Sequence, residues 1–395
     1  MISRKIGLIK ESVTLRVSAK AKQMKKEGID VVGFGAGEPD FDTPSHIKEA
    51  AKRAIDAGFT KYTPASGTKE LKQAICEKLK KDNGLEYTDK EIIVSCGAKH
   101  SLFNALLALC EEGDEVILPS PYWISYPEMI KVAGAKPVIV ETEEKEGFKL
   151  TVFKLKKAIS RKTKILILNS PSNPAGVVYS KDELEDIAEV ITSNNIYCIS
   201  DEIYEKIVYE EKHTSIASLG DKIKEQTIVI NGVSKAYAMT GWRIGYAAAK
   251  EEIIQAMANL QSHSTSNPTS VSQAAALEAL RGEQECVSRM VREFRKRRDF
   301  MVDKINSIEG ISCIKPKGAF YVFVSIRDIL GKKFSGSFIK SALEFSQLLL
   351  DNFSVAVVPG EAFGRNDYIR LSYATSLENI DKGLERIEEF INKLS

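Results

Sequence analysis

The sequence lacks the features that mark several large protein classes. The six cysteines include no pair spaced as Cys-x-x-Cys, so neither a cysteine zinc site nor a dithiol redox motif is predicted. Most of them lie in apolar stretches, as buried free thiols do, which fits a reducing cytosol. No apolar run reaches the ~18 residues of a membrane span, and the charged stretch 1–26 has no signal-peptide core. We therefore expect a cytoplasmic protein without a membrane partner.

The net charge, the histidines and the glycine motifs argue against several further classes of protein. The formal net charge of +2 is too small to indicate nucleic acid as a partner. The basic run Arg295–Arg298 is interpreted as a solvated helix face. The four histidines are far apart in the sequence and predict no metal site. The glycines around Gly33 do not form a dinucleotide fingerprint, and no Gly-x-Ser-x-Gly element occurs, which disfavours an α/β-hydrolase.

What the chain does contain is an alternation of helices and short apolar strands. Its 395 residues suggest two or three domains at about 100–200 residues each. Ile, Val and Leu dominate the strands without alternating with polar residues, as in parallel strands buried on both faces. Strands are predicted at Glu91–Cys96, Glu115–Pro119, Lys136–Glu141, Lys164–Asn169, Tyr197–Asp201 and Thr227–Asn231. We predict an α/β domain with a mainly parallel sheet.

The last third of the chain has a different pattern. A helical pattern from Ser270 to Ser307 is broken near Gly282, and strands and helices then mix in an α+β order. Strands are predicted at Ala319–Ser325, Val355–Val358 and Tyr368–Tyr373, and helices at Phe338–Asp351 and Glu378–Leu394. We expect residues 1–45 to join a small C-terminal domain of residues 286–395, with residues 46–285 forming the large domain.

The stretch Asn231–Gly245 is the most informative in the chain. It follows an apolar strand, is rich in small residues and contains Lys235. A buried ammonium is costly unless it is paired or neutral, and a partly neutral amine is what an imine-forming lysine needs. Taken alone, a lysine in this place is more often a surface lysine on a loop.

This stretch resembles the cofactor-lysine signature of the class I aminotransferases. The signature here is Ser234-Lys235, then Gly241-x-Arg243-x-Gly245. Four more segments match in the family's order: Gly35–Phe41 (GAGEPDF), Tyr62–Gly67 (YTPASG), Asn169–Gly176 (NSPSNPAG) and Ser200–Tyr204 (SDEIY). The resemblance runs from about residue 10 to the C-terminus and is greatest to the bacterial aspartate/prephenate subgroup. It implies a fold-type I enzyme, with a seven-stranded sheet flanked by helices, that uses pyridoxal 5′-phosphate.

The resemblance implies roles for residues around the cofactor. Lys235 would carry it as a Schiff base and shuttle the proton, Asp201 would pair with the pyridine nitrogen, and Tyr204 and Asn173 would reach the phenolic oxygen. The phosphate would lie at a helix N-terminus after Gly97, an arrangement that binds anions well. The further cofactor residues implied are Ala98, Lys99, Ser234, Arg243, Trp123 stacked on the ring, and Tyr62 from the neighbouring subunit of a homodimer.

Substrate residues follow from the same resemblance. Arg370 would hold the α-carboxylate by a bidentate pair, beside the Gly37 backbone, with Trp123 and Asn173 nearby. A dicarboxylate needs a second cation, for which Lys99 is the first candidate and Lys10 and Thr14 are weaker ones. The segment Ser262–Pro268 contains no arginine that could take the part known from animal and enteric aspartate aminotransferases.

We therefore expect a ping-pong aspartate aminotransferase that acts on small amino acids and 2-oxo acids, with 2-oxoglutarate as acceptor and prephenate or glutamate as further substrates. Three alternatives stay open. One is a β-lyase on cystathionine or cysteine conjugates, because the same fold and lysine serve both reactions. Another is an aromatic aminotransferase. The third is a non-catalytic, cofactor-binding regulator, which would usually carry a DNA-binding segment that this sequence does not show.

Overall fold

A computed structural model describes Gly7, Ile9 and residues 13–395 of the chain. Its helices are α2 (Val13–Lys26), α3 (Ser45–Asp56), α4 (Lys69–Asn83), α5 (Ala98–Leu109), α6 (Ser125–Val132), α7 (Val152–Ala158), α8 (Lys181–Asn194), α9 (Asp221–Gln226), α10 (Glu251–Ser262), α11 (Ser270–Arg281), α12 (Glu285–Ser307), α13 (Ala342–Phe353) and α14 (Leu377–Asn392). Most helix ends lie within one or two residues of a polar cap or a glycine.

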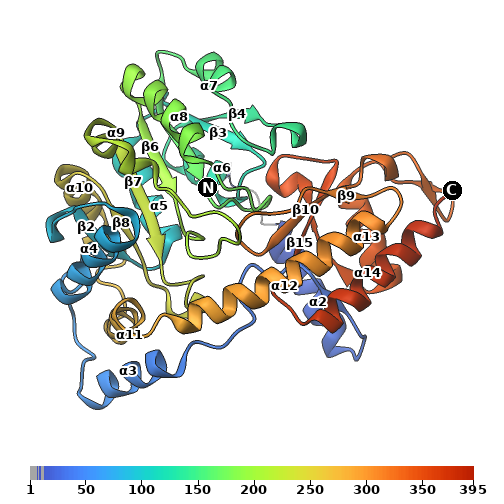
Figure 1. Cartoon of the computed structure of the whole chain (residues 1–395), viewed down its shortest axis with the longest axis horizontal. Coiled ribbons are helices and arrows are strands. Elements are labelled where there is room, and N and C mark those ends of the chain that lie inside the picture. Colours follow the sequence, from blue (N-terminus) through green and yellow to red (C-terminus); the bar gives the residue numbers. More distant parts are fainter. Residues whose placement is uncertain (1–6, 8, 10–12) are drawn as a thin grey trace.

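A seven-stranded sheet, built within the described residues, forms the centre of the larger body in Figure 1. Its order is β2-β8-β7-β6-β5-β3-β4. All neighbours pair in parallel except at β8, which is antiparallel to both β2 and β7. Its strands are β2 (Ile92–Ser95), β3 (Glu115–Ser120), β4 (Lys136–Glu141), β5 (Thr163–Asn169), β6 (Tyr197–Asp201), β7 (Thr227–Gly232) and β8 (Gly245–Ala248). The predicted α/β fold with a mainly parallel sheet is confirmed.

Both faces of this sheet are covered by helices, which explains the uninterrupted apolar strands. Along β5, Ile165 and Ile167 point into the core beneath α5, α6 and α10, whereas Leu166 points into the core beneath α7 and α8. Along β7, Val229 similarly joins a third core, beneath α4 and α11. Because consecutive side chains point to opposite faces, a strand buried on both sides must be apolar at every position.

A second body forms around a four-stranded sheet of the described residues, ordered β14-β15-β10-β9. It lies to the right in Figure 1, and the long helix α12 runs between the two bodies. Its strands, with two short pairs beside the sheet, are β1 (Val32–Gly33), β9 (Ser312–Cys313), β10 (Tyr321–Ser325), β11 (Lys333–Phe334), β12 (Ser337–Phe338), β13 (Val355–Ala356), β14 (Val358–Pro359) and β15 (Tyr368–Ser372). Strand β1 pairs in parallel with β13, so the N-terminal segment packs with C-terminal elements.

Two details differ from the sequence prediction. The strand expected at Val355–Val358 is two strands, because β13 pairs with β1 while β14 pairs with β15. The helix expected from Phe338 begins at Ala342, after the β11–β12 hairpin.

All six cysteines are free thiols. Within the part of the chain that is described, we find no helix with the length and apolar character needed to cross a bilayer.

Candidate active site

A large cavity opens at the carboxyl ends of β5, β6 and β7, where α/β sheets gather ligands. Its volume is about 970 Å³. Most of the site residues predicted from the sequence line it: Gly37, Ala98, Lys99, Trp123, Asn173, Asp201, Tyr204, Ser234, Lys235, Arg243 and Arg370. They come from both bodies, since Arg370 lies on β15 and Asp201 ends β6.

Asp201 is a buried carboxylate with neutral partners. Its Oδ2 accepts a hydrogen bond from the Tyr126 hydroxyl at 2.7 Å, and its Oδ1 accepts one from the Ile203 N–H at 3.3 Å. Burial raises the pKa of Asp201 to about 6, even though both hydrogen bonds lower it. A carboxylate held in this way favours a cationic group as its next neighbour. The site therefore fits the protonated ring nitrogen of pyridoxal 5′-phosphate.

Tyr126 is a site residue that the sequence reasoning missed. It lies on α6, three residues after Trp123, and the two rings meet edge to face with centroids 5.3 Å apart. The side chain is 2% exposed, and its hydroxyl is fixed by Asp201. The spacing of Trp123 and Tyr126, about one helical turn, is a signal that could have found it.

Lys235 follows β7 and extends into the cavity. Its Nζ donates a hydrogen bond to the Gly37 carbonyl at 2.5 Å and lies 5.9 Å from the ring centroids of Tyr204 and Phe320. Burial lowers the pKa of Lys235 to about 8; Arg370 and Arg243 lower it further, while Glu38 and Asp201 oppose the change. An appreciable fraction of this amine is neutral near pH 7, as nucleophilic attack requires.

A cradle of close backbone contacts lies at the start of α5. Gly97 has φ +96°, and a Cβ there would lie 2.4 Å from Nη2 of Arg243. A Cβ on Gly245 would lie 2.0 Å from the Ala98 nitrogen. The Arg243 guanidinium donates to the carbonyls of Thr240 at 2.8 Å and Cys96 at 3.1 Å, so it is held beside the helix N-terminus. Free N–H groups and a guanidinium together fit a phosphate.

Arg370 is the buried cation of the site. Nη1 donates to Asn173 Oδ1 at 3.0 Å and Nη2 to the Gly35 carbonyl at 3.1 Å, while the buried Nε has no hydrogen-bond partner among the described residues. Its guanidinium carbon lies 4.3 Å from the centroid of the Tyr321 ring. A buried guanidinium with an unused donor is suited to binding an anionic ligand.

Two hydroxyls and an amide complete the wall near Arg370. Tyr204 and Tyr321 are buried, and their hydroxyls lie 2.9 Å apart. Asn173 follows Asn169, whose Oδ1 accepts from the Asn173 N–H at 2.9 Å. Tyr321, like Tyr126, was missed by the sequence reasoning, because it comes from β10 in a distant part of the chain.

Lys99 and Trp123 form a pair at one side of the cavity. Nζ of Lys99 lies 4.8 Å from the Trp123 ring centroid, within reach of a cation–π contact. Burial, and then the charge of Arg243, lower the pKa of Lys99.

For three other predicted residues, the structure either shows no contribution to the cavity of this single chain or does not describe the side chain. Tyr62 is 90% exposed and does not line it. Lys10 lies outside the described residues, and Thr14 is on α2 with a side chain outside the described part.

Comparison with known proteins agrees with this geometry. The family model of the aminotransferase class I and II matches residues 29–387. An aspartate aminotransferase of Bacillus sp. (strain YM-2) is 50% identical over 392 residues, covering 99% of both chains. An aspartate/prephenate aminotransferase of Nitrosomonas europaea is 46% identical and covers 99% of this chain and 100% of that protein.

Solved structures give the same result. The aspartate aminotransferase from Rhizobium meliloti has a TM-score of 0.97 at 46% identity and covers 100% of both chains. The aspartate aminotransferase from Thermus thermophilus, solved with maleate, has a TM-score of 0.94 at 43% identity and covers 99% of both chains.

The fold-type I architecture, the resemblance to the aspartate/prephenate subgroup and the cofactor predicted from the sequence are confirmed. With its lysine, buried carboxylate and phosphate cradle around one cavity, the chain belongs to the class I and II aminotransferases and is a pyridoxal 5′-phosphate-dependent transaminase acting on amino acids and 2-oxo acids.

Proposed function

We propose that this transaminase moves the amino group reversibly between L-aspartate and 2-oxoglutarate. One observation carries the proposal: besides Lys235 and the phosphate-cradle Arg243, the described residues that line the cavity include the cations Arg370 and Lys99, together with Lys131, which is paired with Glu128 at 2.9 Å. A dicarboxylic substrate needs a cation for each carboxylate. Relatives named for aspartate, and a neighbour solved with the dicarboxylate maleate, support this choice.

The geometry of the cavity supports the cofactor residues that the family resemblance implies. The cofactor, when bound, supplies an electron-poor ring that accepts the electrons released at the substrate Cα. Asp201, held by Tyr126, would keep the ring nitrogen protonated. Trp123 would stack on the ring, and Tyr204 and Asn173 would donate toward its phenolic oxygen. The phosphate would be bound by the backbone N–H groups of Ala98 and Lys99, which follow Gly97, and by Ser234 and Arg243.

Lys235 is the proposed catalytic residue for proton movement. It would hold the cofactor covalently until the substrate amine displaces it. The released Nζ, with its pKa near 8, would then take the proton from the substrate Cα and deliver it to the carbon that becomes the amine carbon of the cofactor. Tyr204 would assist by stabilising the charge at the phenolic oxygen, and Asp201 by stabilising the charge at the ring nitrogen.

Arg370 would orient the substrate. Asn173 and the Gly35 carbonyl hold Nη1 and Nη2, and Nε, which has no partner among the described residues, would be available to the ligand. The Gly37 backbone would lie beside the same carboxylate. Lys99 would bind the distal carboxylate, and we propose Lys10 and Thr14 as further contacts for prephenate.

We also propose a homodimer in which Tyr62 reaches the neighbouring phosphate site. Tyr62 is 90% exposed here, and Ile55 at 55% and Phe59 at 38% are exposed apolar side chains on the same segment. Exposed apolar side chains that gather in this way mark interfaces. Within each subunit, we propose the division into residues 46–285 and 286–395, with residues 1–45 joining the smaller part, as the β1–β13 pairing supports.

Steady-state kinetics with single pairs of substrates tests this function. We expect parallel double-reciprocal lines for L-aspartate and 2-oxoglutarate, and oxaloacetate as the product. Release of pyruvate from cystathionine or a cysteine conjugate, without amino transfer, would support a β-lyase instead. Higher kcat/KM for aromatic amino acids or prephenate than for the aspartate pair would overturn the aspartate assignment and leave the transaminase unchanged.

A further inference from the structure

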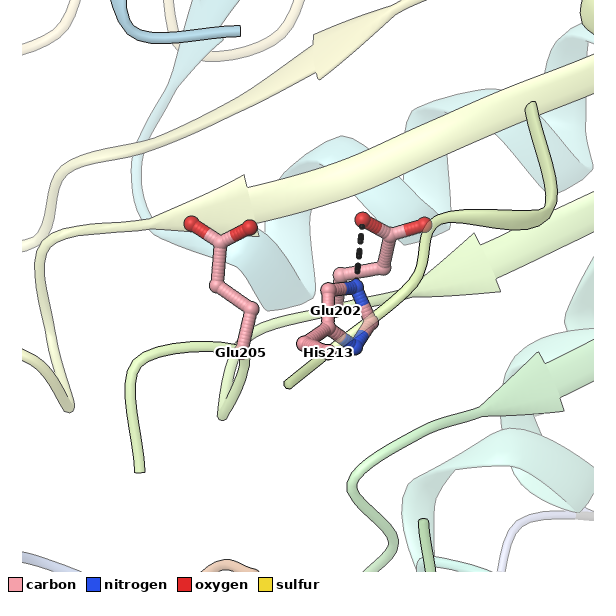
Figure 2. Close-up of side chains that lie close together, drawn as sticks. All are labelled: Glu202, Glu205 and His213. Atoms are coloured by element: carbon pink, nitrogen blue, oxygen red, sulfur yellow. Dashed lines mark hydrogen bonds and ion pairs between the residues drawn. The ribbon is translucent and has the colours of Figure 1, made fainter. Parts of the chain in front are cut away.

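A second cluster of ionisable side chains lies directly behind Asp201, outside the cavity. Figure 2 shows Glu202, Glu205 and His213, whose nearest oxygen and nitrogen atoms all lie within 4.8 Å of one another. The side chains of Glu202 and His213 are 1% and 6% exposed. A buried charge is costly unless an opposite charge or hydrogen-bond donors stabilise it, so the partners of each carboxylate show how its charge is stabilised.

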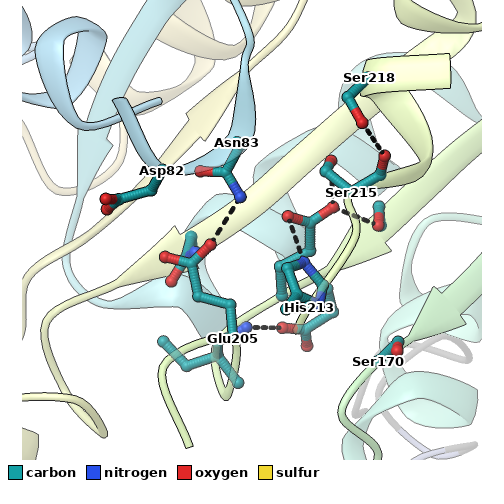
Figure 3. A network of polar contacts seen from close by, with 12 residues as sticks. Asp82, Asn83, Ser170, Glu205, His213, Ser215 and Ser218 are labelled. Atoms are coloured by element: carbon teal, nitrogen blue, oxygen red, sulfur yellow. Dashed lines mark hydrogen bonds and ion pairs between the residues drawn. The ribbon is translucent and has the colours of Figure 1, made fainter. Parts of the chain in front are cut away.

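The cluster has the ligand types of a metal site, but a protein cation already occupies it. Nζ of Lys78, from α4, forms an ion pair with Glu205 Oε1, and both side chains are 6% exposed. Asn83 donates to Glu205 Oε2 at 2.9 Å, as Figure 3 shows. Lys78 also donates to Asn83 Oδ1 at 2.7 Å, so Lys78, Asn83 and Glu205 form one hydrogen-bonded group. A divalent ion would have to displace the ammonium, so we do not assign a metal.

Glu202 is compensated by a different set of donors. Its Oε1 accepts hydrogen bonds from the hydroxyls of Ser200 at 2.8 Å and Ser215 at 2.6 Å, and its Oε2 lies 3.1 Å from Nε2 of His213. Ser200 and Glu202 stand on either side of Asp201 in the sequence. Since side chains alternate along an extended chain, they point away from the cavity while Asp201 points into it.

The four charged groups balance if His213 is protonated. Glu205 and Lys78 neutralise each other, and this interaction lowers the pKa of Glu205 to about 2 although burial opposes it. Glu202 then has His213 as its counter-ion. Burial lowers the pKa of His213, but the charge and hydrogen bond of Glu202, with the charge of Glu205, outweigh burial and raise it.

Other titratable groups that face the cluster do not supply this charge. Lys206 and Asp82 pair with each other at 2.7 Å. The remaining groups are neutral near pH 7, because burial raises their pKa values: Tyr87, Cys198, Tyr237 and Tyr246. His213 is thus the group whose charge decides whether Glu202 is neutralised.

We propose that protonated His213, by neutralising Glu202, is a positioning residue that keeps Asp201 ionised for the ring nitrogen of the cofactor. The inference rests on the proposed role of Asp201. The charge of Glu202 acts on the neighbouring carboxylate and raises the pKa of Asp201, so an unpaired Glu202 would favour the neutral acid. A neutral Asp201 could no longer hold a proton on the ring by charge.

Two substitutions with opposite expected signs test the proposal. His213→Gln places an amide donor where Nε2 lies but removes the charge, so the titration of Asp201 should move to higher pH. Glu202→Gln removes the neighbouring negative charge, so the titration should move to lower pH. The double variant, which contains neither charge, should return close to wild type. A merely structural loosening would shift both single variants in the same direction.

The readout is the dissociation constant of pyridoxamine 5′-phosphate for the cofactor-free protein between pH 5 and pH 8. This ligand binds without a bond to Lys235. At the acid end we expect binding roughly three- to tenfold weaker for His213→Gln and tighter by a similar factor for Glu202→Gln, since tenfold corresponds to about one pKa unit. Shifts in the same direction, or none in either variant, would overturn the inference. Thermal melting of each variant checks that it is folded.

A ligand with a CH group in place of the ring nitrogen separates the proposed role of Asp201 from the proposed role of His213. Its affinity for the wild type should lack the acid dependence that the ring nitrogen confers and should be the same in all variants. If wild-type protein binds both ligands alike at every pH, the role of Asp201 is wrong and the inference falls with it. If the ligands differ but His213→Gln has no effect, only the role of His213 is wrong.

The state of His213 can be observed directly in the cofactor-free protein. The chain has four histidines, so the signal of His213 is the one that His213→Gln removes from the histidine NMR spectrum. We expect it to titrate above the ordinary value of about 6.5 in the wild type and lower in Glu202→Gln. A neutral His213 at pH 6 in the wild type would contradict the proposal.

Discussion

Replacing Arg370 by lysine tests substrate orientation most sharply. In the folded chain, Nη1 and Nη2 of Arg370 donate to Asn173 and the Gly35 carbonyl, and Nε has no partner among the described residues, so it is available for the proposed ligand. A lysine has one ammonium, which cannot satisfy these two acceptors and bind a carboxylate at two points. Losing one charge-assisted hydrogen bond costs about 1.5–3 kcal/mol. The expected loss in kcat/KM for L-aspartate is therefore about 10- to 150-fold.

The assay is steady-state formation of oxaloacetate at saturating 2-oxoglutarate. Because the α-carboxylate is bound in the ground state as well as in the transition state, much of the loss should appear as a higher KM. Arg281→Lys is the matched control: Arg281 also binds a carboxylate with two nitrogens, on Glu77 at the surface, and should keep wild-type kinetics. A loss below about threefold for Arg370→Lys would refute the assignment, as would an equal loss for β-alanine, which lacks the α-carboxylate.

Three further outcomes are expected. Acylation of Lys235 in the cofactor-free protein, followed by peptide mass spectrometry, should rise with a midpoint near pH 8, because burial favours the neutral amine; a midpoint above pH 10 would contradict the lowered pKa. Gly97→Ala should weaken cofactor binding at least about tenfold, because the backbone has φ +96° and the new Cβ would meet Arg243; unchanged affinity in equilibrium dialysis would show that the cradle tolerates a side chain. Arg298→Ala should reduce the free energy of unfolding by about 3 kcal/mol in urea, because the buried guanidinium binds Glu210; a change under about 1 kcal/mol would contradict this.

The large sheet was predictable from the sequence wherever strands are long and apolar. Residues 136–141 and 197–201 form β4 and β6 as expected, because β-branched and leucine runs bounded by polar residues have one stable arrangement in an α/β layer. Strand β8 was not predicted. It has only four residues, Gly245–Ala248, of which three are Gly or Ala, and it lies antiparallel between β2 and β7, so neither length nor an apolar run marks it.

The site was predictable where each residue follows a strand or starts a helix. Asp201 ends β6, Lys235 follows β7 and Gly97 precedes α5, so their positions depend on local patterns. Tyr321 depends on a contact between distant segments, and the Glu202–His213 pair depends on how the loop after β6 folds back on the strand end. His213, in a loop after β6, has no periodic signal and gains its partner only when the chain folds. Such pairs are set by tertiary packing, which a single sequence does not reveal.

The most direct test of the central claim is an absorbance titration of the purified, cofactor-loaded protein beside its Lys235→Ala variant. For the wild type we predict a visible band that moves to shorter wavelength when L-aspartate is added and returns with 2-oxoglutarate. The variant should bind the cofactor but complete no such cycle. A wild-type protein with no visible band after addition of pyridoxal 5′-phosphate, or a variant that cycles as fast as the wild type, would contradict the role of Lys235.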